Sequence, residues 1–298
     1  FYGVQRQASG SRLLVPEQST NTSIGFVLQP HESVTLTFDM WSIEKEDTIG
    51  LFGEENHILY DLVLRLEAGT ANCSDPASLG NPAVSRVAHD PTDTDLVDGF
   101  LDVGLCPVGE VDFVSDVYTN LDTRKLEGYD LGIYWDLDSD SGDWRFKYNG
   151  SFYTEFEQTA SGPLSTAVIA AKEANPDIVY PLVGLGDLLG INGNQKSRHS
   201  ASITWRKNDW GASIQGFRIS AFNQILSNGD AFPIPAMTTY NTKVDYDFDF
   251  GDTDMRIRLG VNNISDKRAP LADGSYGFFQ DAHRDWGRYW YLDLRISL

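Results

Sequence analysis

The chain has 298 residues, enough for one large all-β domain or two ordinary ones, and 43 acidic against 23 basic residues give it a net charge of −20. A nucleic-acid-binding protein needs a basic surface, so this charge argues against nucleic acid as a partner. No apolar run approaches the ~18–20 residues that a membrane helix requires, but apolar residues alternate with polar ones along much of the chain, which is the period of β-strands.

The N-terminal part combines an expected loop with two strand patterns. Residues 1–20 are expected to be a loop. No methionine, basic segment or apolar signal segment stands at the beginning, so we interpret the chain as a fragment of a longer protein. Apolar and polar residues then alternate in residues 22–29 and again in 34–40, on the two sides of a short turn at Pro30. These segments are expected to be neighbouring strands.

A long insertion at residues 49–112 interrupts the strand patterns. Residues 51–112 hold 12 acidic and 2 basic side chains. This charge fits either a solvated loop surface or an entrance that attracts cationic or metal-bearing ligands. Apolar residues at helical spacing predict a short amphipathic helix over 54–67. The remainder is rich in Asp, Gly, Pro and Ser, and a loop of this length is usually functional or disordered.

Two cysteines, Cys73 and Cys106, lie within this insertion. Two cysteines in one external loop favour a disulfide that closes the loop, with free thiols as the alternative. Two thiolates without a nearby histidine fall short of a zinc site. Four carboxylates could collect a calcium ion, although their spacing matches no rigid calcium loop, so no metal site is assigned: Asp90, Asp93, Asp95 and Asp98.

Strand patterns resume at residue 123 and continue to the C-terminus. The expected strands are 123–137, 144–156, 198–207, 210–223, 240–250, 255–262 and 290–298. Short turns at Pro30, Asp138, Asn208 and Gly251 alternate with long connections at 49–112, 157–197, 224–237 and 265–286, and a helix is expected near 165–174. In transmembrane barrels, short turns face the periplasm and long loops face outside.

Tryptophans gather at the ends of these strands. Trp135 and Trp144 stand beside one short turn, and Trp205 and Trp210 stand beside the next. An apolar strand face can cover a soluble core or face lipid, and indole rings at strand ends are typical of the membrane interface. We therefore interpret the strands as membrane-spanning.

Several segments resemble the C-terminal barrel of TonB-dependent outer-membrane transporters. Residues 14–20 (LVPEQST) resemble the Leu-x-Pro-Glu-x-Ser segment of this family, and residues 123–131 (TRKLEGYDL) resemble its x-Gly-hydrophobic-Asp/Glu strand. Residues 259–270 (LGVNNISDKRAP) and 287–298 (GRYWYLDLRISL) resemble its last two strands, in which Asn-hydrophobic-x-Asp-Lys is followed by a loop with a proline and a closing strand of the form Gly-Arg-aromatic-x-aromatic. The family usually ends in Phe, whereas this chain has Leu298.

The resemblance implies an all-β fold, namely part of an antiparallel transmembrane β-barrel of about 22 strands with long external loops that carry short helices. The nine expected strands would be the last nine, so that residues 1–298 form the C-terminal portion of the barrel domain, and the plug domain and TonB contact would lie upstream. Nine strands cannot close into such a barrel, so we expect a strongly curved open sheet with edges at 22–29 and 288–298.

The same resemblance implies a function in the outer membrane of a Gram-negative bacterium. Family members take up scarce nutrients such as oligosaccharides, metal–siderophores, haem or cobalamin, with energy supplied through TonB, ExbB and ExbD. The alternative is a passive porin or another outer-membrane barrel. No catalytic constellation and no cofactor motif is evident, so we do not expect an enzyme.

Loop aromatics are the candidate ligand contacts: Phe232, Tyr276, Phe278 and Phe279. Aromatic rings in a loop can stack on sugars or planar iron chelates, or they can pack the loop on itself. The acidic insertion disfavours an anionic free siderophore, although salt reduces this effect. The sequence therefore favours a neutral oligosaccharide or a metal complex of low charge.

Overall fold

The computed structural model describes residues 4–160, 162–226, 229–251, 253–274 and 276–297. It divides into two compact units. The wall unit comprises residues 21–43, 126–156 and 188–298, and the loop unit comprises residues 1–20, 44–125 and 157–187.

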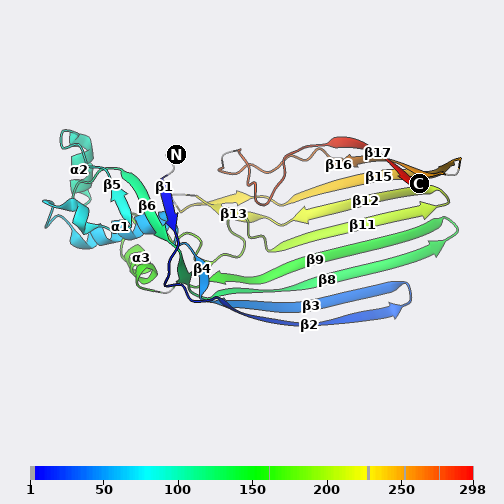
Figure 1. Ribbon diagram of the computed structural model, residues 1–298, viewed down its shortest axis with the longest axis horizontal. Helices are drawn as coiled ribbons and strands as arrows, with labels where there is room; N and C mark the ends of the chain where they lie inside the picture. Colours follow the sequence, from blue (N-terminus) through cyan, green and yellow to red (C-terminus); the bar gives the residue numbers. More distant parts are fainter. Residues whose placement is uncertain (1–3, 161, 227–228, 252, 275, 298) are drawn as a thin grey trace. The chain divides into compact units, whose positions relative to one another are not determined.

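The wall unit is built on one antiparallel sheet, whose strands follow one another in chain order (Figure 1). In sheet order the strands are β2 (Gln18–His31), β3 (Val34–Glu46), β8 (Arg124–Ser139), β9 (Gly142–Gln158), β11 (Ser197–Lys207), β12 (Trp210–Ile219), β15 (Met237–Phe250), β16 (Thr253–Asn262) and β17 (Tyr289–Ser297). A short strand, β10 (Gly186–Asp187), pairs with β9 away from this path. The predicted set of nine wall strands is confirmed.

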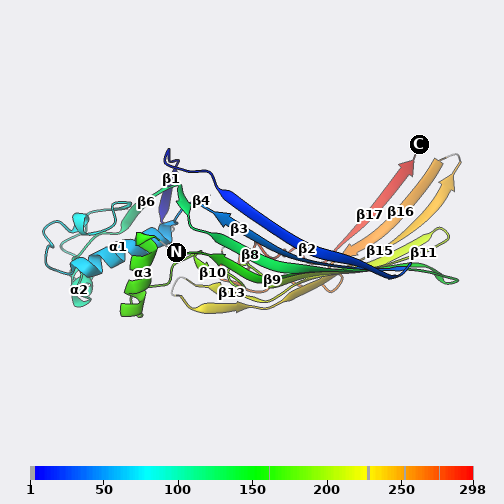
Figure 2. The same ribbon diagram turned by 90° about the horizontal axis from the view of Figure 1, so that it is seen from below.

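The sheet is open, with β2 and β17 at its two edges. Figure 2 shows the strands at the β17 edge turning away from the plane of β8 and β9, so the sheet is curved. Within the described parts of the chain, the two edge strands do not pair with each other. The expected open, curved sheet is therefore confirmed.

One face of the sheet exposes apolar side chains in continuous rows. Register places apolar residues side by side across neighbouring strands: Phe146–Ile203–Ile214 on β9, β11 and β12, and Val244–Leu259–Leu292 on β15, β16 and β17. Most of these side chains are exposed, up to 70% for Leu292. Soluble domains rarely expose apolar surface of this extent, whereas the lipid-facing side of a membrane barrel must do so.

The opposite face carries charges that neutralise one another across strands. The carboxylate of Asp245 on β15 is almost fully buried and accepts a hydrogen bond from the Arg206 guanidinium at 3.0 Å. Arg258 and Arg256 on β16 approach the same carboxylate at 3.8 and 3.9 Å. This face therefore suits a polar barrel interior rather than lipid.

Aromatic rings cluster at the ends of the strands where the short turns lie. Trp144 is paired with Trp205 across β9 and β11, with ring centroids 6.3 Å apart. Trp135 stacks on Phe146 at 5.1 Å. The tight turn between β11 and β12 uses Asn208 at a positive φ of 50°, a conformation that asparagine tolerates better than most residues. These contacts place the tryptophans as an interfacial girdle would require.

The loop unit is a small mixed domain. Its helices are α1 (Glu54–Ala68), α2 (Thr94–Asp102), α3 (Pro163–Ala174) and the 3₁₀ helix η1 (Pro76–Leu79), and its strands are β1 (Gln5–Ser9), β4 (Thr48–Gly50), β5 (Val84–Arg86), β6 (Val111–Val117) and β7 (Thr119–Leu121). Leu59 and Val63 of α1 pack with Val168 of α3 and with Val179, which follows α3. The predicted helices at 54–67 and 165–174 are confirmed.

Two sequence-based expectations for the loops are corrected by the structure. Residues 1–20 are not all loop, because β1 pairs in parallel with β6 and places Gln5 beside Phe113. The connection 224–237 contains a short hairpin of β13 (Phe222–Ile225) and β14 (Ala231–Ile234). Both elements are held by backbone pairing and not by an alternating pattern, so the local sequence did not reveal them.

None of the described helices is long and apolar enough to span a membrane.

Candidate functional site

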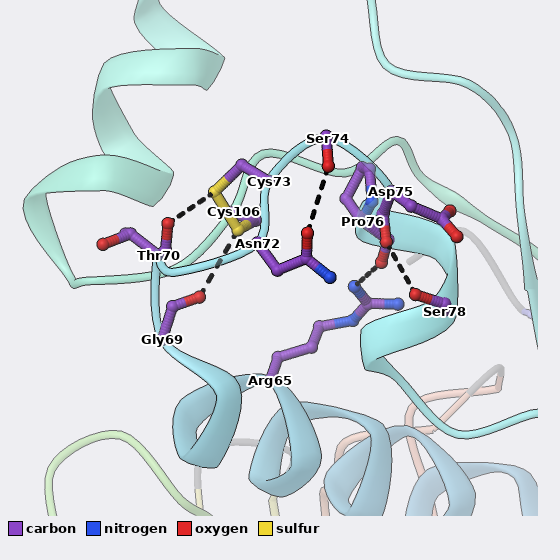
Figure 3. Close-up of a disulfide and its surroundings, with 10 residues drawn as sticks. All are labelled: Arg65, Gly69, Thr70, Asn72, Cys73, Ser74, Asp75, Pro76, Ser78 and Cys106. Carbon is purple, nitrogen blue, oxygen red and sulfur yellow. Dashed lines mark hydrogen bonds between the residues drawn. A yellow bond between two sulfur atoms is a disulfide. The ribbon is translucent and has the colours of Figure 1, made fainter.

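The acidic insertion is a folded part of the loop unit that a disulfide fastens (Figure 3). Cys73 and Cys106 are bonded, with Cα atoms 5.1 Å apart, a separation within the usual range for disulfides. Each sulfur also lies 3.4 Å from a backbone oxygen, that of Thr70 for Cys73 and that of Gly69 for Cys106. The disulfide joins the segment after α1 to the segment after α2.

Asp61 on α1 is the charged centre of this insertion. Its carboxylate is wholly buried and accepts hydrogen bonds from Arg65 at 2.9 Å, from Arg86 at 2.8 Å and from the Asn81 backbone N–H at 2.8 Å. Arg65 also donates to the Pro76 carbonyl at 2.7 Å, which ties η1 to α1 (Figure 3). Buried charges are tolerated only when they are paired and hydrogen-bonded, and both conditions hold here.

A histidine–aspartate pair beside α1 holds the structure and does not resemble a catalytic base. His57 Nε2 lies 3.2 Å from the buried Asp116 carboxylate, and His57 Nδ1 lies 3.2 Å from the Asn81 amide nitrogen. An amide nitrogen only donates, so Nδ1 accepts from Asn81, and the Nε2–H group donates a hydrogen bond to the Asp116 carboxylate. Both ring nitrogens are therefore occupied, and Asp116 also accepts from the Gly53 backbone at 3.1 Å.

Two of the four aspartates considered as calcium ligands, Asp90 and Asp93, have other partners. The Asp90 carboxylate accepts hydrogen bonds from the hydroxyl and backbone N–H of Thr92, which lower the pKa of Asp90. Asp93 caps α2 by accepting from the Leu96 N–H at 3.1 Å. In the part of the chain that the structure describes, no group of three or more histidine, cysteine, aspartate or glutamate side chains is arranged to hold a metal ion.

The four aromatic candidates differ in their surroundings. Phe279 packs edge-on against Phe222 with centroids 5.2 Å apart, and its ring fills the space beside Gly193. Phe278 forms an isolated backbone bridge with Leu271. Among the described ring contacts, Phe279 is the only candidate that takes part.

Two of the four candidates are exposed side chains. Phe232 lies on β14 opposite Gln224 with 37% of its surface exposed, and Tyr276 in the last loop is 73% exposed. These two side chains can meet a ligand without disturbing the packing around Phe279. Exposure cannot be read from a loop sequence, so the sequence alone did not separate the two pairs.

A buried histidine in the last loop was not recognised from the sequence. His283 is only 2% exposed, stacks on Phe222 at 5.7 Å, and has no hydrogen-bond partner for either ring nitrogen among the described residues. Burial lowers the pKa of His283, and the nearby Phe279 backbone opposes this shift only in part. Near the loop ends, Arg268 pairs with Asp285 and helps to lower the pKa of Asp285 to about 2.

Comparison of the sequence with known protein families identifies the family to which the chain belongs. The family described as TonB dependent receptor-like, beta-barrel matches residues 1–264. The chain belongs to this family. TonB-dependent receptors are outer-membrane transporters of Gram-negative bacteria and not enzymes. The matched region includes β16, the strand that runs into the Asn-Ile-Ser-Asp-Lys segment. The matched region ends at residue 264, before the closing strand β17.

Solved TonB-dependent receptors share the fold. The siderophore receptor PirA from Acinetobacter baumannii is 14% identical, with a TM-score of 0.53 over 94% of this chain and 32% of that one. The ferripyoverdine receptor of Pseudomonas aeruginosa is 11% identical, with a TM-score of 0.52 over 96% and 28%. The FrpB iron transporter from Neisseria meningitidis is 12% identical, with a TM-score of 0.50 over 96% and 32%.

The chain spans about a third of the length of these receptors. At such low identity the likeness concerns the fold alone. No curated protein matches the sequence.

Proposed function

We propose that residues 1–298 form the C-terminal part of the barrel of a receptor that takes a scarce nutrient across the outer membrane, with energy supplied through TonB, ExbB and ExbD. The observation that carries this proposal is the open nine-stranded sheet, with an exposed apolar face and a charged opposite face. Such a sheet is unfavourable in water, because its apolar face is exposed and the backbone groups of its edge strands are unpaired. Lipid and further strands would cover them.

The proposed nutrient is a neutral oligosaccharide or a metal complex of low charge. The loop unit contains 22 acidic and 8 basic residues. Like charges repel an anion that approaches through such a surface, although the effect is screened beyond a Debye length of roughly 8 Å at physiological salt. Phe232 and Tyr276 provide exposed rings that can stack on a sugar or on a planar chelate.

The test is uptake and binding by the full-length receptor. Maltodextrins, a ferric siderophore, cobalamin and haem are compared in cells with and without functional TonB. Uptake of one neutral or weakly charged ligand that stops without TonB is expected. Uptake that continues unchanged without TonB would instead indicate a passive porin.

Three variants then test the aromatic contacts. Phe232→Ala and Tyr276→Ala are expected to weaken ligand binding while leaving the loop intact, because both rings are exposed. Phe279→Ala is the comparison variant. This ring packs on Phe222, so its loss should loosen the last loop, whereas the other two variants should leave the loop intact. Unchanged affinity in both Phe232→Ala and Tyr276→Ala would remove these residues from the site.

A further inference from the structure

An arginine interrupts the apolar face of the wall unit. Arg218 lies near the end of β12, and the register aligns it with His199 on β11 and Thr238 on β15. Alternate positions of a strand share a face, so Arg218 is on the same face as Ile214, a member of the exposed apolar rows. A charged group on a lipid-facing surface is unfavourable unless its charge is compensated.

Arg218 has no carboxylate partner among the described residues. Its exposed guanidinium donates one hydrogen bond, to the Thr238 hydroxyl at 3.0 Å, and further N–H groups remain. By contrast, three arginines of the charged face share the carboxylate of Asp245: Arg206, Arg256 and Arg258. The counter-charge for Arg218 therefore has to come from outside the described sheet.

The neighbouring strands do not supply this counter-charge. β12 lies inside the sheet, with β11 on one side and β15 on the other (Figure 1). The ring of His199 on β11 is already engaged, because Nδ1 lies 2.8 Å from the Tyr148 hydroxyl and Nε2 lies 2.9 Å from the Ser197 hydroxyl. An imidazole carries no negative charge in either protonation state, so His199 cannot neutralise Arg218.

A tyrosine beside Arg218 offers a second donor. Tyr240 on β15 is opposite Gly216, so it is the diagonal neighbour of Arg218, within reach of long side chains. Gly216 has no side chain, and the Tyr240 ring lies over this position. The Tyr240 side chain is 44% exposed, and its hydroxyl makes no hydrogen bond with the described residues. One external acceptor can therefore meet both the guanidinium and this hydroxyl.

The position of Arg218 along the strand matches the depth of lipid headgroups. Trp210 at the short-turn end of β12 and Arg218 are eight positions apart, which is about 26 Å along a strand at ~3.3 Å per residue. A strand tilt of ~40° reduces this to about 20 Å of depth, against an apolar band of about 25 Å. The long arginine side chain spans the difference by extending toward the interface. Tyrosine is also typical of that interface.

Phosphate is the anion that fits this position. Headgroups are the source of negative charge at the surface of a bilayer. A planar guanidinium binds phosphate through two parallel hydrogen bonds, which a compact ammonium group cannot do. Arg218 is close to the connection that follows β12, which is one of the long ones and therefore faces outside the cell. The headgroup belongs to the outer leaflet.

We propose that Arg218 and Tyr240 bind the phosphate group of an anionic lipid in the outer leaflet. The guanidinium donates two hydrogen bonds to the phosphate oxygens, and the Tyr240 hydroxyl donates a third. The acyl chains lie along the apolar face, beside Ile214 and Val244. This site goes beyond the uptake function and does not depend on it, because lipid binding is measured without a nutrient and without transport.

The test uses the full-length receptor purified in an uncharged detergent. Native mass spectrometry compares dioleoyl phosphatidic acid with diolein, which has the same acyl chains and no phosphate. Phosphatidic acid is expected to bind at least about tenfold more tightly, a preference worth about 1.4 kcal/mol. Equal binding of the two lipids would overturn the proposed ligand class. Inorganic phosphate is the third probe, and displacement of phosphatidic acid by an equal concentration of it would assign the site to a free anion instead.

Matched variants locate the lipid at Arg218. Arg218→Ala breaks no ion pair within the described chain and is expected to weaken phosphatidic acid binding about tenfold. Arg218→Lys keeps the charge but loses the paired hydrogen bonds, so a loss of about threefold is expected. Tyr240→Phe removes only the hydroxyl and should also cost about threefold.

The control is a cation at the other end of the same pair of strands. Lys207 at the short turn is exposed and donates to the Asp140 carbonyl at 2.7 Å. Lys207→Ala is expected to leave phosphatidic acid binding unchanged. Wild-type binding by Arg218→Ala would place the lipid elsewhere and overturn the site. Equal losses in Arg218→Ala and Lys207→Ala would show general attraction by positive charge, which also overturns it.

Discussion

Replacing Asp61 by alanine is expected to unfold the acidic insertion locally. Asp61 is wholly buried and pairs with Arg65, which is 5% exposed, and with Arg86, which is 20% exposed. Removing one partner of a buried ion pair leaves uncompensated charge and typically costs about 3–5 kcal/mol. Here two guanidiniums lose the same carboxylate. Among the described residues, Arg65 then keeps the Pro76 carbonyl and Arg86 keeps the Gly109 carbonyl as acceptors.

The effect is best measured as opening of the loop unit, since Asp61, Arg65 and Arg86 all lie in that unit. Native-state proteolysis follows the population of the open form when opening and closing are fast. Because each 1.4 kcal/mol is a factor of ten, the expected loss raises cleavage in residues 54–110 by roughly 10²- to 4 × 10³-fold.

The matched control is a salt bridge of the same unit that is exposed. Glu54→Ala removes the partner of Arg6, and both side chains of that pair are more than a third open to solvent. Exposed pairs contribute about 0–1 kcal/mol, so Glu54→Ala should change cleavage by less than about fivefold. If Asp61→Ala were no more sensitive to protease than Glu54→Ala, the assignment of Asp61 as the charged centre would be refuted.

Three further predictions concern the loops. Joint replacement of Cys73 and Cys106 by serine is expected to destabilise the loop unit by about 3–4 kcal/mol, because the disulfide no longer links two positions 33 residues apart. Hydrogen exchange of α1 and α2 measures this loss of stability, and unchanged exchange would contradict the prediction. Gly193→Ala places a Cβ against the Phe279 ring at a φ of 90° and should speed proteolysis of residues 265–286; equal proteolysis would contradict the packing. Burial lowers the pKa of His283, so its imidazole binds a proton more readily in the unfolded loop than in the folded loop. The folded loop is therefore most stable above about pH 6.5, the pKa of the unfolded state, and becomes less stable below it. His283→Phe should remove this pH dependence in hydrogen exchange, and an unchanged pH dependence would assign it to another group.

The wall was predictable from the sequence because its information is local. Period-2 alternation identifies each strand, and turns such as Asn208–Asp209 separate strands that also become neighbours in the sheet. Strand ends were less certain: the strand expected over 210–223 ends at Ile219, and Phe222 begins β13. The apolar and charged faces follow directly from the alternation.

The loop unit was less predictable because its contacts are distant in sequence. The polar strand β1 shows no alternation of its own and is ordered by pairing with β6. A cavity in this unit is lined by residues of α1, β6–β7 and α3, so no single segment carries a signal for it. Similarly, the sequence left open whether Phe279 contacts a ligand or packs its own loop, and the packing partners Gly193 and Phe222 lie in distant segments.

The central claim, that the short turns lie on the periplasmic side and the long loops lie outside the cell, is tested most directly by labelling intact cells. The described chain has no free cysteine, so single cysteines can be introduced at two exposed positions, Asp98 on α2 and Asp209 in the turn between β11 and β12. With a maleimide too large to cross the outer membrane, Asp98→Cys is expected to react in intact cells, and Asp209→Cys is expected to react only after the membrane is opened. Labelling of Asp209→Cys in intact cells, with Asp98→Cys protected, would contradict the account.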